Sequence, residues 1–441
     1  MPRPATAPVH GGGDVAPASQ RAPKLQRPPT ESAAPRLMVK PERRTKADLL
    51  AAAAIVTVVA AAAALIWWTS DARATISRPA AVPAPNPTPA QAVPASLREL
   101  WRAPSPATAQ PVAAGGSVVT GDGRVVEGRD PATGAVRWSY ARDADLCGVS
   151  WVYRFAVAVY RDDRGCGQVS TLDASTGQRG PARSSYSNKQ VELSSDGTTV
   201  LSAGDTRLEL WRSDMVRMLS YGEVDARVKP TSKGLRTGCR LTSAAASSSA
   251  VSVFEACGRQ ADLRLTLLRP AKEEDEPDQH NVAEPGIGAD SGAEVLAVSE
   301  TRTAVYLPAP QPRVDVVDET GTTIASTLLP EPPLTSNVVT RSSNLITWWT
   351  GHRVLVFDAA NLTYRYSVGP AGSSAPVGPA TLMAGKLMVP VTEGIAVCDP
   401  ATGVDEDFLP VRREPSGAAV IPLASGSQLL EQRGTTLVAL G

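Results

Sequence analysis

The sequence predicts an all-β fold, an eight-bladed β-propeller, preceded by a single transmembrane α-helix and a disordered N-terminal tail. Two observations predict it. A strand–turn–strand pattern recurs about every 40 residues, which is the length of one four-stranded blade. An uncharged apolar segment, residues 49–69, lies upstream of the repeats. Seven blades are the alternative, if residues 207–313 form one irregular blade instead of two.

The chain divides by composition into a cytoplasmic tail (1–48), a transmembrane helix (49–69), a Pro/Ala-rich extracytoplasmic linker (70–97) and the propeller (98–441). The tail holds nine Lys/Arg and four Asp/Glu, a formal charge of +5. The other 35 basic and 40 acidic residues leave the remainder at −5. A basic stub on an acidic body argues against nucleic-acid binding.

The apolar segment contains no charged residue between Leu49 and Trp68. About 20 residues span roughly 30 Å as a helix, the thickness of the hydrocarbon core. Basic residues before it and aromatic residues at its end predict a single pass through the cell membrane with the N-terminus in the cytoplasm. A signal peptide cleaved near Ala72–Ala74 is the alternative. The long tail and the length of the apolar run disfavour it.

The tail lacks hydrophobic periodicity and is expected to be either a docking or phosphorylation segment or an inert stub that sets topology. The linker contains six prolines between Pro79 and Pro94. Proline favours extended polyproline II structure, so the linker is expected to be a semi-rigid spacer that holds the domain up to about 80 Å from the bilayer.

The clearest repeat runs from Val125 to Trp138. It is a strand, a D-x-x-T-G turn from Asp130 to Gly134, and a second strand. Aspartate bonds the backbone downstream of it, and glycine supplies the positive φ of a tight turn. The turn returns, without the tryptophan, at Asp173–Gly177 and Asp399–Gly403. The eight copies of the first strand begin at Val125, Val169, Arg207, Leu263, Val314, Val354, Ile395 and Thr436.

The motif from Asp130 to Trp138 resembles the repeat of the quinoprotein-type (PQQ-like) β-propellers, and residues 98–441 resemble a series of degenerate blades of that family. Together with the anchor and a composition typical of GC-rich bacteria, the resemblance is to an actinobacterial-like envelope protein. The resemblance implies a propeller fold. For activity it leaves two classes, quinone-dependent dehydrogenases and non-enzymatic scaffolds.

The chemistry of a quinoprotein dehydrogenase has no counterpart in the sequence, which lacks adjacent cysteines, a C-x-x-C-H motif and a D-x-D-x-D-G calcium loop. The acidic run Glu273–Asp278 is interpreted as a cation- or partner-binding loop or, preferably, a solvated, mobile insertion that widens the outer turn of one blade. His352, among aromatic residues, is interpreted as a packed or turn residue. We therefore predict no catalytic, cofactor-binding or metal-binding residues and no cofactor.

The five cysteines include two pairs with similar separations, which predict the disulfides Cys147–Cys166 and Cys239–Cys257, each within one blade. Cys398 is expected to be free and buried. The alternative is five unpaired cysteines.

The last strand lacks a successor, and the segment from Leu97 to Arg102 has the character of a fourth strand. We predict that it pairs with residues 436–440 and closes the ring.

The predicted function is a membrane-anchored, non-enzymatic propeller that binds or scaffolds a cell-envelope protein or polymer. The alternatives are a quinoprotein-like oxidoreductase and an extracytoplasmic sensor. Residues 212–312, which include the acidic insertion 272–280 and the loop Lys229–Gly234, interrupt the repeat and are the expected binding sector.

Overall fold

The computed structural model describes residues 45–223, 238–258, 262–274, 276–334, 338–370, 374–414 and 417–441. Contacts divide the chain into two units, Met1–Ala64 and Leu65–Gly441. All but the last four residues of the expected tail, and the loop Lys229–Gly234, lie outside the described residues.

Helix α1 (Lys46–Thr69) contains the expected apolar segment and has a mean hydropathy of 2.7 over its most apolar window, which makes it a candidate membrane span. Thr45 and Asp48 cap its start reciprocally. Asp48 Oδ2 accepts from the Thr45 amide at 2.8 Å, and Thr45 Oγ1 accepts from the Asp48 amide at 3.2 Å. The cap starts the helix at Lys46, three residues before the uncharged segment that begins at Leu49. A short helix, α2 (Asp71–Ala74), follows.

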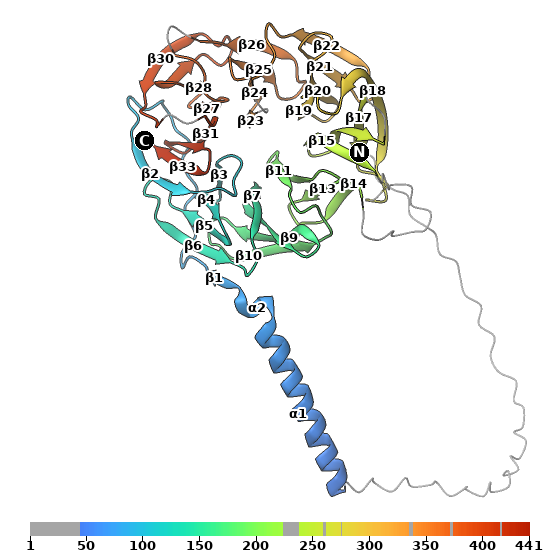
Figure 1. The fold of residues 1–441 in the computed structure, drawn as a ribbon. Helices are drawn as coiled ribbons and strands as arrows, with labels where there is room; N and C mark the ends of the chain where they lie inside the picture. The colour runs from blue at the N-terminus through green and yellow to red at the C-terminus, as the bar shows by residue number, and fades with distance from the viewer. Residues whose placement is uncertain are drawn as a thin grey trace, which may run out of the picture. The chain divides into compact units, whose positions relative to one another are not determined.

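The rest of the described chain forms eight antiparallel sheets arranged as the blades of a ring (Figure 1). Blade 1 contains β3 (Val112–Ala114), β4 (Ser117–Asp122), β5 (Val125–Arg129) and β6 (Val136–Ala141), with β1 (Ile76–Arg78) as a fifth strand. Blade 2 contains β7 (Leu146–Val152), β8 (Phe155–Asp162), β9 (Gly165–Asp173) and β10 (Arg179–Ser184). Blade 3 contains β11 (Glu192–Ser195), β12 (Thr199–Ala203), β13 (Arg207–Arg212) and β14 (Arg217–Gly222).

Blade 4 contains β15 (Cys239–Ala246), β16 (Val251–Cys257), β17 (Asp262–Arg269) and β18 (Asp278–Gly288). Blade 5 contains β19 (Glu294–Val298), β20 (Arg302–Leu307), β21 (Arg313–Asp318) and β22 (Thr323–Leu328). Blade 6 contains β23 (Val338–Ser342), β24 (Leu345–Trp349), β25 (Val354–Asp358) and β26 (Tyr364–Val368). Blade 7 contains β27 (Thr381–Met383), β28 (Lys386–Val391), β29 (Gly394–Cys398) and β30 (Asp405–Pro410). Blade 8 contains β31 (Val420–Ser425), β32 (Gln428–Arg433), β33 (Thr436–Leu440) and β2 (Glu99–Pro104).

The predicted eight-bladed propeller is confirmed. Each of the eight recurring strands is the third strand of its blade, and blade 4 is a complete sheet of its own, so the alternative of seven blades is wrong. The third strands of blades 2 to 8 are mostly buried because neighbouring blades cover both of their faces, whereas in β5 of blade 1 buried residues alternate with more exposed ones. Continuous apolar runs such as Val354–Phe357 follow from that burial.

The ring closes as predicted, by pairing the two ends of the propeller chain. β2 pairs antiparallel with β33, with Trp101 opposite Ala439 and Glu99 opposite Leu440. Arg98 and Gly441 exchange two further backbone hydrogen bonds, at 3.2 and 3.0 Å. The first and last segments therefore share one sheet, which leaves no unpaired edge between the ends of the ring.

Neighbouring blades dock through an aromatic side chain on the fourth strand of one blade and the turn of the next. Trp138 of blade 1 donates its indole N–H to the carbonyl of Ala174 in the blade 2 turn at 2.7 Å. Trp101 of blade 8 donates in the same way to Pro131 at 2.9 Å. The hydroxyl of Tyr366 in blade 6 donates to Pro400 in the blade 7 turn at 2.7 Å.

The glycine of each turn makes room for the docked ring. Gly134, Gly177 and Gly403 have φ of +71°, +74° and +73°. A Cβ on Gly177 would lie 2.6 Å from the Trp138 side chain, and a Cβ on Gly134 would lie 2.6 Å from Trp101. The glycine is needed twice, for the turn conformation and for the contact between blades.

The turn aspartates act as expected for turn residues. Asp399 Oδ1 accepts from the amides of Ala401 at 2.9 Å and Thr402 at 2.8 Å. Hydrogen bonds from Thr402 lower the pKa of the Asp399 carboxyl. Asp130 and Asp173 also accept from amides in their own turns.

The expected free-standing spacer is wrong for most of the linker. β1 pairs with β6, with Ile76 opposite Ala141. The amides of Ala80 and Ala84 then donate to the carbonyls of Thr176 and Ser175 at 2.8 and 2.9 Å. Ala84 and Leu97 are buried. Small residues and prolines lie flat against a surface and offer few competing hydrogen bonds, so residues 76–97 form a strap across the propeller.

Replacing Gly177 with alanine tests the docking. We expect Gly177→Ala to lower the free energy of unfolding by at least about 1–2 kcal/mol, because a left-handed conformation with a Cβ costs that much before any clash with Trp138. Gly369→Ala is the matched control, since its Cβ meets nothing within 4 Å and its φ is not in the left-handed region. Urea unfolding followed by tryptophan fluorescence measures both. Equal effects of the two substitutions would contradict the docking role.

Candidate binding surfaces of the propeller

The residues that the sequence singled out for chemistry are held in structural contacts. His352 lies between β24 and β25, and its Nδ1 is 3.4 Å from a carboxylate oxygen of Glu331. His280 lies in β18, where a Cβ on Gly321 of the next blade would be 2.9 Å from its ring. Neither contact arranges a nucleophile and a base.

The described residues of the acidic run Glu273–Asp278 lie in the outer turn of blade 4, as expected for an insertion that widens such a turn. Glu274 accepts from Arg217 of blade 3, with Nε at 3.0 Å, and its carbonyl accepts from the Ser220 amide at 2.7 Å. Asp278 is already the first residue of β18 and pairs with Arg269. The turn therefore also contacts blade 3, which the sequence did not predict.

The strand that follows this turn is unusual among the described residues. β18 has 11 residues, the longest of the strands, and is the fourth strand of blade 4. Most of its residues are exposed, and in the described chain it pairs only with β17. Burial and the nearby carboxylate of Asp315 raise the pKa of Glu284 near its end. β18 and the described residues of the acidic turn together form the acidic edge of blade 4, residues 273–274 and 276–284.

A buried carboxylate joins blades 2 and 3. Glu209 in β13 is 3% exposed. It accepts from Arg183 of blade 2 at 3.1 Å, from Arg207 at 2.5 Å and from Arg217 at 3.2 Å. Burial alone would raise the pKa of the Glu209 carboxyl, but the guanidinium groups of Arg207 and Arg183 outweigh it and lower that pKa.

Between blades 2 and 3, this charge network takes the place of the aromatic docking contact. Arg183 lies on the fourth strand of its blade, as Trp138 does, and its Nη1 donates to the Met215 carbonyl in the blade 3 turn at 3.3 Å. Arg217 extends the chain of contacts to Glu274 of blade 4. Blades 2 to 4 are thus joined by ion pairs.

The structure contains both predicted disulfides, Cys147–Cys166 and Cys239–Cys257. Cys398 is free and buried. Burial and the carboxylate of Asp405 raise the pKa of the Cys398 thiol, so it stays protonated and unreactive.

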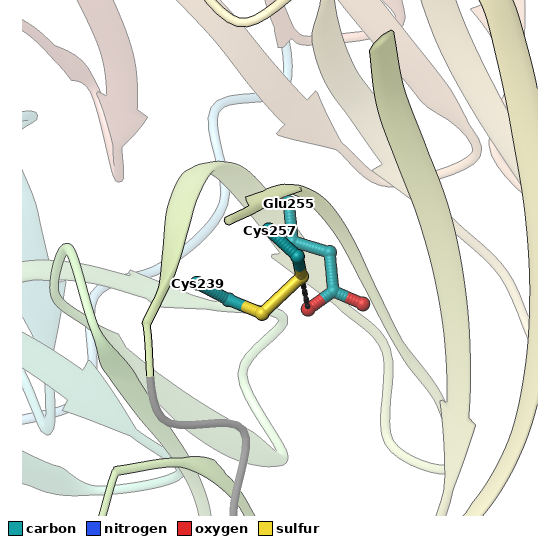
Figure 2. Close-up of side chains that lie close together, drawn as sticks. All are labelled: Cys239, Glu255 and Cys257. Carbon is teal, nitrogen blue, oxygen red and sulfur yellow. Dashed lines mark hydrogen bonds between the residues drawn. A yellow bond between two sulfur atoms is a disulfide. The ribbon is translucent and has the colours of Figure 1, made fainter. Parts of the chain in front are cut away.

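The second disulfide lies beside a buried carboxylate (Figure 2). Glu255 and Cys257 are two residues apart in β16, so their side chains lie on the same face of the sheet. Cys239 of β15 lies directly opposite Cys257. Their ligand atoms lie within 4.8 Å of one another, a spacing that suits a metal ion. Because the two sulfurs are bonded to each other, and Arg264 already contacts Glu255 and Cys257, the oxidised cluster does not provide a metal site.

Two cavities open within the propeller unit. One, of about 360 Å³, is lined by the first strands of blades 3 to 6, the innermost strands in Figure 1, and carries Glu192, Asp196, Glu294 and Arg341. The other, of about 400 Å³, lies between the strap and the first turns of blades 7, 8 and 1, and its lining residues are uncharged. The charged one has the character of a polar central channel.

Sequence reasoning missed the strap, the Glu209 network and the Glu255–Arg264 pair. Charged residues within a strand, such as Glu209 between Leu208 and Leu210, were the available signal, because charge on a doubly covered strand requires a buried partner. The strap has little signal in the sequence, because its only strand, Ile76–Arg78, is three residues long.

Comparisons with known proteins found similarity among solved structures alone. No protein-family model matches the sequence, and no curated protein matches it. Among solved structures, BamB from Moraxella catarrhalis has a TM-score of 0.45 at 14% identity, covering 78% of this chain and 99% of BamB. The C-terminal WD40 domain of Sif2 has a TM-score of 0.47 at 10% identity, covering 78% and 98%. The dihydro-heme d1 dehydrogenase NirN has a TM-score of 0.44 at 17% identity, covering 79% and 76%.

Replacing Glu209 with glutamine tests the charge network. We expect Glu209→Gln to cost about 3–5 kcal/mol of unfolding free energy at pH 7, because it leaves buried guanidinium groups without their partner. Since the folded-state pKa is lowered, the carboxylate's contribution is complete above its unfolded-state pKa and is lost as pH falls through the folded-state value.

The difference between wild type and Glu209→Gln should therefore shrink on acidification below about pH 4. Urea titrations at several pH values measure it. The exposed Glu414, whose carboxylate is 3.6 Å from Arg102, supplies the control substitution Glu414→Gln, with a cost of less than about 1 kcal/mol. A difference that does not depend on pH would show that Glu209 does not act through its charge.

Proposed function

We propose that this protein is a single-pass, membrane-anchored β-propeller that binds or scaffolds a cell-envelope protein or polymer without catalysing a reaction. Helix α1 spans the cell membrane as residues 49–69, the tail 1–48 is cytoplasmic, and the chain from residue 70 is extracytoplasmic. Basic residues before the helix and Trp67–Trp68 at its end support this orientation.

The two disulfides support an extracytoplasmic location for the propeller. Disulfides persist in oxidising compartments and are rare where thiol reductants maintain free cysteines. Each joins strands within a single blade, Cys147–Cys166 in blade 2 and Cys239–Cys257 in blade 4. They therefore stabilise the part of the ring in which ion pairs replace aromatic docking.

The acidic edge of blade 4 is the observation that carries the binding proposal. It combines a turn of acidic residues, held in place by Arg217, with a long exposed edge strand. An edge strand offers backbone groups to an added strand, and β1 already adds to blade 1 in this way. A basic, extended segment of an envelope protein fits this surface, and its binding weakens with salt.

The strap shortens the tether of the propeller. Because residues 76–97 pack on the blades, only residues 70–75 remain as a spacer. Six residues reach at most about 20 Å, far less than the expected 80 Å.

Reporter fusions test the topology. A phosphatase that folds only outside the cytoplasm should be active when fused after residue 440 and inactive when fused after residue 20, because the basic flank retains the tail inside. The opposite pattern would reverse the assignment. A protein that loses its first 70 residues on maturation would instead support a cleaved signal.

Charge reversal tests the binding surface. Glu276 and Asp278 are exposed in the acidic edge, so Glu276→Lys combined with Asp278→Lys should weaken partner capture by about tenfold. Asp163→Lys with Glu393→Lys makes the same charge change at exposed positions of blades 2 and 7 and should leave capture unchanged. Crosslinking in intact cells, with capture from detergent at low and high salt, is the measurement. Equal capture by both variants would exclude this edge as the binding site.

A further inference from the structure

The two disulfides lie in different electrostatic surroundings. Around Cys239–Cys257, Arg264 Nη2 donates to Cys257 Sγ at 3.1 Å, and Glu255 Oε2 lies 3.6 Å from the same sulfur. Around Cys147–Cys166, Cys166 Sγ lies 3.0 Å from the backbone carbonyl oxygen of Lys189. A cationic donor faces one sulfur, and the negative end of a carbonyl dipole faces the other.

The two disulfides are alike in burial. Cys166 is completely buried in an apolar cluster with Val157, Val159 and Val169, and Cys239 is also buried. Their partners Cys147 and Cys257 are both partly exposed. The difference between the two disulfides is therefore in the charges that surround them.

The chemistry of disulfide exchange favours the pair beside Arg264. A thiolate attacks one sulfur, and the other leaves as a thiolate, faster when its negative charge is stabilised. Arg264 is in place to stabilise Cys257 as that leaving thiolate. Glu255 opposes this by its charge, but it is held by Arg264 at 2.9 Å and by Tyr221 at 2.9 Å.

Glu255 also provides for the reduced state. In the disulfide, Cys257 carries no proton, so the contact drawn between the two residues in Figure 2 joins two acceptors. Once Cys257 is a thiol, it can donate to Glu255 Oε2 across the same 3.6 Å separation. The reduced side chain therefore finds a hydrogen-bond acceptor without rearrangement of the fully buried carboxylate.

We propose that Cys239–Cys257 is a redox-active disulfide, reduced by a dithiol protein of the envelope, whereas Cys147–Cys166 is structural. A thiolate of the dithiol attacks Cys239 Sγ, and the S–S electron pair leaves with Cys257. The second thiol of the dithiol then attacks the mixed disulfide and releases Cys239. The dithiol is oxidised to a disulfide, and its two protons pass to Cys239 and Cys257.

Reduction releases the crosslink at the open end of the β15–β16 hairpin in blade 4, the blade that carries the acidic edge. The other paired residues of the ladder, from Arg240 opposite Ala256 to Ala246 opposite Val251, stay in place. The inference does not require that the acidic edge binds a partner, because its test reads thiols and not binding.

Differential alkylation with mass spectrometry tests the proposal on the full-length protein in detergent, with dithiothreitol as the probe. Cys239 and Cys257 should become alkylated on the order of tenfold faster than Cys147 and Cys166. Arg264→Gln should remove most of that advantage, and Arg264→Lys should retain part of it. Arg240→Gln, which removes a nearby guanidinium paired with Asp290, is the matched control and should change nothing.

Equal reduction rates for the two disulfides in the wild-type protein would overturn the proposal. An unchanged rate in Arg264→Gln would overturn the role of Arg264. If Arg264→Gln does not fold, the wild-type rates and Arg264→Lys still decide, since a charge retained at residue 264 must keep Cys239–Cys257 the faster of the two.

Discussion

The contact between the fourth strand of one blade and the turn of the next is the interaction on which this structure depends. Trp138 and Trp101 each reach over a glycine and donate to a carbonyl in the following turn. One side chain thus fixes the turn conformation, the spacing of two blades and the burial of a large ring. Trp101 lies in β2, the strand that pairs with β33 to close the ring. Its contact with the blade 1 turn therefore also helps to keep blades 8 and 1 together.

Ion pairs take over this role in blades 2 to 4. Arg183, Glu209, Arg217 and Glu274 form a continuous chain of charges across three blades, with Glu274 at its exposed end. Removing one partner of a buried ion pair is strongly destabilising, because the other charge is left buried and unpaired. The intact pair nevertheless contributes little more to stability than well-packed apolar side chains would. Blades 2 to 4 also contain both disulfides and the acidic edge. The disulfides therefore lie in the part of the ring where the contacts between blades are more polar.

Local chemistry explains which features the sequence predicted. The eight third strands, the blade count and the closing strand followed from a repeated turn, whose aspartate and glycine act within a few residues. The disulfides followed from spacing within one blade. By contrast, the contact of Glu274 with Arg217 joins residues 57 positions apart, and the linker packs on Ser175 and Thr176 of blade 2. Contacts between distant positions leave no periodic signal in a single chain.

The most direct test of the account is hydrogen exchange in β33, compared with β29, the third strand of the preceding blade. If the ring is closed by β2, the amides of residues 436–440 lie between two strands and should be protected to the same degree as those of 394–398. Protection of both segments until the whole domain unfolds is the predicted result. Rapid exchange in 436–440 while 394–398 stay protected would show that the ring is open and would contradict the account.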